Sequence, residues 1–81
     1  MEYEVDSSPG ELFAEFGKAI AIGQPCDITY KIPANGVQTI TFYPRLINTV
    51  GQVYCMGVVE GSGKNARIMI ELNTPVLYLS E

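Results

Sequence analysis

Residues 26–42 of this 81-residue chain read CDITYKIPANGVQTITF, and this stretch decides the fold. Apolar side chains occupy every second position from Cys26 to Ile32, which predicts a half-buried strand over those residues. The Ala34-Asn35-Gly36 step predicts a hairpin turn, because Asn-Gly accepts positive φ angles. A long, Thr-rich strand is then expected over residues 37–47. Pro44 marks a bend or a sheet edge in it, because proline donates no ladder hydrogen bond.

The remaining C-terminal part of the chain continues as strand and turn. We expect a turn at 48–51, a strand at 52–60, a flexible loop at 61–65, a strand at 66–72, a turn at 73–75 and a strand at 76–80. The strand at 52–60 is apolar on both faces except near its ends, which suits a curved strand, and Gly57 is its expected bend.

One helix precedes these strands, over residues 9–22. Ser8 is a good N-cap, Pro9 suits the first helical position and Glu11 completes a capping box. The apolar stripe that this helix should bury consists of Leu12, Phe13, Phe16, Ala19 and Ile20. Gly23 and Pro25 end the helix.

The order of one helix and five short antiparallel strands predicts a mainly β protein. We expect a small five-stranded Sm-like barrel over residues 26–80, because closure removes sheet edges that would otherwise aggregate. The helix would cap one open end through its apolar stripe. Residues 1–7 form either a loose arm or an extra edge strand. The whole chain, residues 1–81, is a single domain.

Composition narrows the class of function. The chain has 5 basic and 9 acidic residues, a net charge of −4 and no histidine. An extended nucleic-acid surface is not expected, because phosphate contacts need lysine and arginine. No zinc site or cofactor is expected, and Cys26 and Cys55 are interpreted mainly as reduced thiols packed as small hydrophobes. The acidic N-terminus and the absence of a long apolar run predict a cytoplasmic protein without a membrane span.

The sequence contains no convincing catalytic motif, so no enzyme activity is predicted. Gly61-Ser62-Gly63-Lys64 resembles a phosphate loop, but Val58 stands where its first glycine should be and Asn65 where Ser or Thr should bind Mg²⁺. We interpret it as a hairpin tip. With no histidine, a nucleophile would need a lysine or carboxylate base, and the lysines fall on expected solvent faces or on the loop tip.

A set of aromatic and arginine residues is the main candidate for binding. Its members are Tyr30, Tyr43, Arg45, Tyr54 and Arg67. On a small barrel they could stack against a base or hold an anionic group. The competing interpretation is that the tyrosines belong to the core and the arginines are surface charges.

The run from Leu12 to Leu79 resembles a WYL domain in the order and spacing of several short motifs. These are Ala19-Ile20, Ile28-x-Tyr30, Pro44, Gly51-Gln52-Val53-Tyr54-Cys55 and Arg67-Ile68-Met69-Ile70. The trio that names the family keeps only its tyrosine, Tyr54. The resemblance implies an Sm-like barrel that senses a small ligand or nucleic acid in bacterial transcription or defence regulation, with basic residues of the strand at Arg67 in the site.

Two hypotheses of different class follow. In the first, the chain is a regulatory module that binds a small anionic ligand, a nucleotide or a partner protein. Tyr54 and Arg67 are the first candidates for its binding site, and Tyr30 and Arg45 are the second. In the second, the barrel is a structural or assembly protein that forms homo-oligomers or docks without a ligand.

Overall fold

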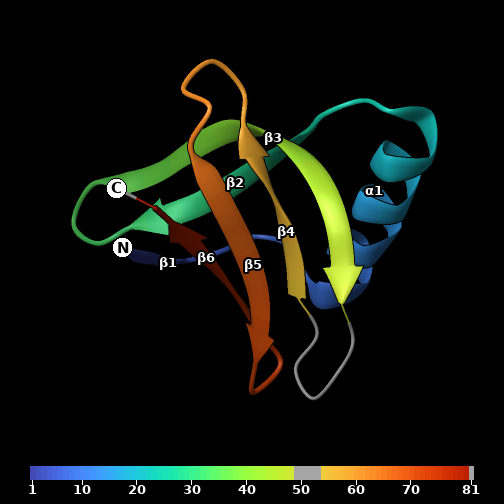
Figure 1. The fold of residues 1–81 in the computed structure, drawn as a ribbon. Helices are drawn as coiled ribbons and strands as arrows, with labels where there is room; N and C mark the ends of the chain where they lie inside the picture. Colours follow the sequence, from blue (N-terminus) through green and yellow to red (C-terminus); the bar gives the residue numbers. More distant parts are fainter. Residues whose placement is uncertain (49–53, 81) are drawn as a thin grey trace.

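One helix and six strands make up the part of the chain that the computed structural model describes, residues 1–48 and 54–80 (Figure 1). They are β1 (Glu2–Glu4), α1 (Pro9–Ile22), β2 (Cys26–Ile32), β3 (Gly36–Asn48), β4 (Tyr54–Val59), β5 (Asn65–Glu71) and β6 (Thr74–Leu79). The protein is therefore mainly β with one N-terminal helix, as predicted. The sixth strand is β1, which is one of the two forms expected for residues 1–7.

The strands form a single antiparallel sheet that curls into a nearly closed barrel. Their order is β1-β6-β5-β4-β3-β2, so β1 and β2 are the edges. The edges meet at an isolated bridge between Val5 and Tyr30. Beside it, the Asp6 backbone N–H donates to the Thr29 carbonyl oxygen over 2.8 Å. This contact joins the edges at one point and leaves the rest of the seam without ladder pairs in the described residues.

The core consists of inward side chains from every part of the barrel. Its largest fully buried members are Phe42, Leu12, Ile28, Ile68, Leu77 and Cys55. Alternation along β2 places Ile28 and Tyr30 inside, as the sequence predicts. No polar or charged side chain is buried among the residues that the structure describes, so apolar burial holds this barrel together.

The helix has the predicted bounds and caps. The Ser8 Oγ accepts a hydrogen bond from the Glu11 backbone N–H over 3.3 Å. Gly23 ends the helix at φ 69°, a left-handed conformation that glycine adopts readily. The Phe16 ring packs edge-on against Phe42 of β3, with 5.9 Å between ring centroids.

The buried stripe of α1 is narrower than the sequence suggested. Leu12, Phe16 and Ala19 are buried, whereas Phe13 and Ile20 are 36% and 39% exposed. At about 100° per residue, the three buried residues share one line on the helix, and the other two lie roughly 80–100° from Leu12. The prediction that Phe13 and Ile20 belong to the buried stripe is wrong for that reason.

The β2–β3 hairpin forms where it was predicted, with a different turn. Positive φ angles fall at Ala34 (67°) and Gly36 (87°), and Asn35 does not have one. The Asn35 backbone N–H donates instead to the Ile32 carbonyl oxygen over 3.0 Å. The expected Asn-Gly pair of positive φ angles is therefore wrong, although the two strands still pair in register.

Strand β3 bends sharply between Pro44 and Leu46, where a β-bulge shifts its register against β4. Pro44 lies at the bend and beyond Phe42, the last residue of β3 that pairs with β2, so at Pro44 the strand pairs with β4 alone. Opposite Pro44 stands Gly57. A Cβ there would lie 2.1 Å from the Tyr43 carbonyl oxygen and 2.6 Å from the Phe42 ring, so the bend requires glycine at this position.

The remaining boundaries follow the sequence closely. The Gly61–Lys64 segment is the tip of the β4–β5 hairpin, between two antiparallel strands, as predicted. The β5–β6 turn takes positive φ at Leu72 and Asn73. The turn expected at 48–51 and the start of the strand expected at 52 extend into residues 49–53, which lie outside the described residues.

Candidate functional site

The four predicted site residues occupy three different places. Tyr54 and Arg67 share the outer face of the sheet, as diagonal neighbours on β4 and β5. Tyr30 is 5% exposed and lies in the core. Arg45 is at the β3 bulge. The structure therefore brings together only Tyr54 and Arg67.

Tyr30 is part of the barrel wall. Its ring stacks at a tilt on Tyr3, with 4.9 Å between centroids. Burial, with a smaller contribution from Tyr3, raises the pKa of Tyr30. This aromatic pair joins β1 to β2 beside the Val5 bridge, so Tyr30 helps to close the barrel.

Arg45 belongs to a separate hollow of about 370 Å³ next to the end of α1. Residues of the helix end, including Gly23 and Gln24, line this hollow together with Tyr43 and Arg45. None of the other three predicted residues lines it. The bulge accounts for this, because it leaves Arg45 without a partner across the ladder.

Two rows of cross-strand partners on the outer face of β3–β6 form a surface that we name the outer patch. One row runs Leu46, Met56, Arg67, Tyr78, and the next runs Tyr54, Met69, Val76. Leu46 is 55% exposed and Met56 43% exposed. Asn48 lies at one end of the second row, and Glu2 and Glu4 lie at the β1 ends of the two rows. The patch is thus a contiguous area of methionine, tyrosine, aliphatic and arginine side chains on one curved sheet.

Arg67 occupies the middle of the outer patch. Its guanidinium lies over the Tyr78 ring, 4.7 Å from the centroid. The single ion pair recorded among the described residues joins Lys31 to Glu4, so Arg67 has none there. Arg67 and Tyr78 also line a hollow of about 300 Å³ with Met56 and Asn65. The Arg67 charge is therefore stacked on an aromatic face and remains available to a partner.

Hydrogen bonds fix the two tyrosines of the patch. The Tyr78 hydroxyl donates a short bond to the Glu71 carboxylate. This bond, followed by desolvation and by the Glu2 charge, raises the pKa of Tyr78 to about 12. The Asn48 Nδ2 donates to the Tyr54 hydroxyl over 2.8 Å. The Tyr78 phenol is therefore neutral at physiological pH, and the hydrogen bonds give both phenol groups defined orientations.

Sequence reasoning missed Leu46, Met56 and Tyr78 as members of this surface. Tyr78 was missed because the turn expected at 73–75 would place Ile70 opposite Tyr78, on the inner face of the sheet. The actual turn at Leu72 and Asn73 shifts the register and places Arg67 opposite Tyr78. Leu46 carried no signal, because the bulge alone turns it outward.

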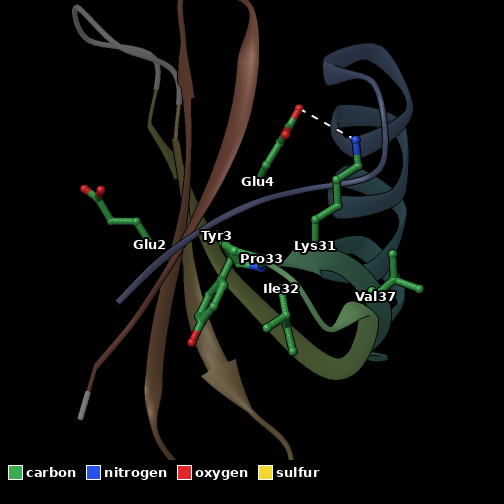
Figure 2. Close-up of a pocket in the computed structure, with 8 residues that line it drawn as sticks. Glu2, Tyr3, Glu4, Lys31, Ile32, Pro33 and Val37 are labelled. Atoms are coloured by element: carbon green, nitrogen blue, oxygen red, sulfur yellow. Dashed lines mark ion pairs between the residues drawn. The ribbon is translucent and has the colours of Figure 1, made fainter.

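Another hollow, of about 500 Å³, lies in the seam between β1 and the β2–β3 hairpin (Figure 2). Tyr3, Ile32, Pro33 and Val37 give it apolar walls. Glu4 and Lys31 point toward each other across it, with 3.9 Å between Oε1 and Nζ (Figure 2). Among the described residues, Lys31 is the only cation that lines this hollow. Because Lys31 already pairs with Glu4, these residues offer no unpaired positive charge in the seam.

The two cysteines are free thiols without activating neighbours. Cys55 is 2% exposed, and burial raises its pKa to about 12. Burial, then Glu15 and Asp27, raise the pKa of Cys26 to about 11. A nucleophilic thiol needs a lowered pKa, so the environments of both thiols oppose reactivity. In residues 1–48 and 54–80, no group of three or more Cys, Asp or Glu side chains could hold a metal ion.

Over the same residues, no helix has the length and apolar character needed to cross a membrane. Comparison of the chain with protein-family models, with curated proteins and with solved structures finds no match.

Proposed function

We propose that this chain is a non-catalytic, WYL-like regulatory module that acts through a partner protein, and that the partner binds the outer patch. A bacterial transcription- or defence-related process is the setting that the sequence resemblance implies, and the acidic N-terminus and the lack of a long apolar run favour the cytoplasm. One observation carries the proposal: Arg67, stacked on Tyr78, lies at the centre of a partly exposed row that includes Met56 and Leu46.

The composition of the patch favours a protein partner. Centres of protein interfaces are enriched in tyrosine, methionine and arginine and depleted of lysine and acidic residues. Five of the seven residues of the two rows are tyrosine, methionine or arginine, none is lysine or acidic, and Glu2 and Glu4 lie at the edge. Interface hot spots are also enriched in tyrosine and arginine. Arg67 and Tyr78 are therefore the anchors that we expect to matter most.

A small anionic ligand or nucleotide at Arg67 is the second candidate. Its support is the Arg67 guanidinium without an ion pair in the described residues, beside the 300 Å³ hollow. The negative charge around the site disfavours an anionic ligand. Glu71 and Glu2 both lie close enough to Tyr78 to raise its pKa, and the chain carries a net charge of −4. A phosphate would meet these carboxylates, whereas a protein partner can contribute its own cations toward them.

Photo-crosslinking in the source cell tests the proposal. A benzophenone side chain at Met56 should give one discrete adduct with another protein. The same probe at Glu15, on the exposed face of α1, is the matched control and should not give that adduct. An adduct of twice the chain mass would favour homo-oligomeric assembly instead. Identical adduct patterns at both positions, or none at position 56, would contradict a partner on this face.

Titration with nucleotides and short oligonucleotides separates the second candidate. If the site binds a protein, the wild type and the Arg67→Ala variant should give equal and weak binding signals with these ligands. Saturable binding that Arg67→Ala removes would replace the proposed partner with an anionic ligand.

A further inference from the structure

Another cavity, of about 330 Å³, is lined by inward-facing residues of four strands. Its apolar wall consists of Tyr3 of β1, Ile40 of β3, Val59 of β4 and Leu79 of β6. All four are half-buried and pack against the core. Strands β1 and β6 lie on the side of the barrel away from α1, so the helix leaves this mouth uncovered (Figure 1). Barrel mouths are common places for small-molecule sites, and this volume is at the lower end of the usual range of about 300–1,000 Å³.

The rim of this mouth is polar and carries a positive charge. Ser62 and Lys64 of the β4–β5 hairpin tip, Ser80 after β6 and Met1 line it. The Met1 amino group donates to the Leu79 carbonyl oxygen over 3.2 Å. The Lys64 backbone N–H donates to the Ser62 Oγ over 3.2 Å, and the Lys64 carbonyl oxygen accepts from the Val59 N–H over 2.8 Å. The backbone of the tip is thus anchored to the strand end. Lys64 is held beside the opening.

Charge at the mouth differs from that of the rest of the molecule. No carboxylate lines this cavity among the described residues, although the chain has 9 acidic residues in all. The recorded ion pair of residues 1–48 and 54–80 is between Lys31 and Glu4, which leaves the Lys64 ammonium unpaired there. In the seam hollow, by contrast, Lys31 faces Glu4 and Glu2 is also in the lining. An apolar hollow lined by Lys64 and Met1, with no carboxylate in its lining among the described residues, is complementary to an amphipathic anion.

We infer that the barrel mouth binds a small carboxylate with a hydrocarbon body, such as a medium-chain fatty carboxylate. The chain of the ligand lies against Tyr3, Ile40, Val59 and Leu79. Its carboxylate accepts hydrogen bonds from the Lys64 ammonium and from the Ser62 and Ser80 hydroxyls. The apolar wall of the mouth consists of inward-facing residues, whereas the outer patch consists of outward-facing ones. The mouth adjoins the hollow beside Arg67, because Met1, Leu79 and Ser80 line both.

Titration of ¹⁵N-labelled protein with octanoate, below its micelle concentration, tests the inference. Octanoate should bind saturably and shift the amides of Ile40, Val59, Lys64 and Leu79. Octan-1-ol should bind more weakly, and octylammonium more weakly still. Lys64→Gln should weaken octanoate binding by about two- to fivefold, the effect of one exposed ion pair, and leave octan-1-ol binding unchanged. Lys18→Gln, on the exposed part of α1, is the matched control and should change neither.

Three results would overturn the inference. They are non-saturable octanoate shifts, shifts that map to other residues, and equal losses in the Lys64 and Lys18 variants. Both substitutions are at exposed positions, so the variants should fold as wild type. Binding at the mouth and crosslinking at position 56 are measured independently, so failure of one does not imply failure of the other.

Discussion

At the residue scale, Gly57 shows how one missing Cβ allows the barrel to curve. Strand β3 passes so close to Gly57 that any side chain would meet the Tyr43 carbonyl and the Phe42 ring. The carbonyl is backbone and Phe42 is fully buried, so neither can move aside cheaply. Gly57→Ala should therefore lower the free energy of unfolding by roughly 1–3 kcal/mol. Gly17→Ala, in α1 with no heavy atom within 4 Å, should raise it by about 0.5–1 kcal/mol. Urea melts followed by circular dichroism measure both, and a neutral Gly57→Ala would mean that β3 does not approach β4 this closely.

At the element scale, the helix tests the packing of the core. Phe16 is 2% exposed and contacts Phe42, whereas its neighbour Glu15 is exposed. Phe16→Ala should cost about 3–5 kcal/mol, as large-to-small core substitutions do. That is most of the stability expected of a domain this small, so the variant should be largely unfolded. Glu15→Ala should change stability by less than about 0.5 kcal/mol. Similar urea midpoints for the two variants would show that α1 does not pack on the sheet through Phe16.

The elements of this fold are local, and for that reason the sequence predicted them well. The cap at Ser8, the stop at Gly23 and the alternation from Cys26 to Ile32 each depend on neighbours a few residues away. The β1 strand was harder to predict, because its pairing partner β6 is more than 70 residues distant. Phe13 and Ile20 were misplaced because apolar spacing alone does not give the width of the buried stripe.

The candidate site was less predictable than the fold, because it depends on which face each strand residue takes. Tyr30 shares its alternation with Ile28 and Ile32, so the sequence did carry the signal that it points inward. Arg45 and Leu46 carried no such signal, since a bulge changes the face of every residue after it. Tyr54 and Arg67 lie on strands without a bulge between them, and the structure places them on the same face.

At the scale of the whole molecule, the titrating groups give a pH dependence with a definite sign. Cys26, Cys55, Tyr30, Tyr43 and Tyr78 all have raised pKa values, and each is neutral when protonated. Unfolded thiols titrate near 9.0, whereas the folded ones titrate near 11 and 12. Between these values the folded state holds protons that the unfolded state releases. Stability should therefore be fully present below pH 9 and should fall as the pH rises toward 12.

Urea midpoints at pH 7.5, 9.5 and 10.5, in the presence of a reductant, measure this decline. A Cys26→Ser, Cys55→Ala double variant should show a shallower slope, whatever its absolute stability. A midpoint that stays level or rises across this range would contradict the buried, neutral state of the two thiols.

The central claim is that the outer patch is a surface for a partner protein and contributes little to folding. The most direct measurement is the yield of the photo-crosslinked adduct from a probe at Leu46, compared between Arg67→Ala and Lys31→Ala. Both replace one exposed strand cation, but only Arg67 lies in the patch. We predict that Arg67→Ala abolishes the adduct and changes the free energy of unfolding by less than about 1 kcal/mol, while Lys31→Ala retains the adduct. A full adduct yield in the Arg67→Ala protein would contradict the claim.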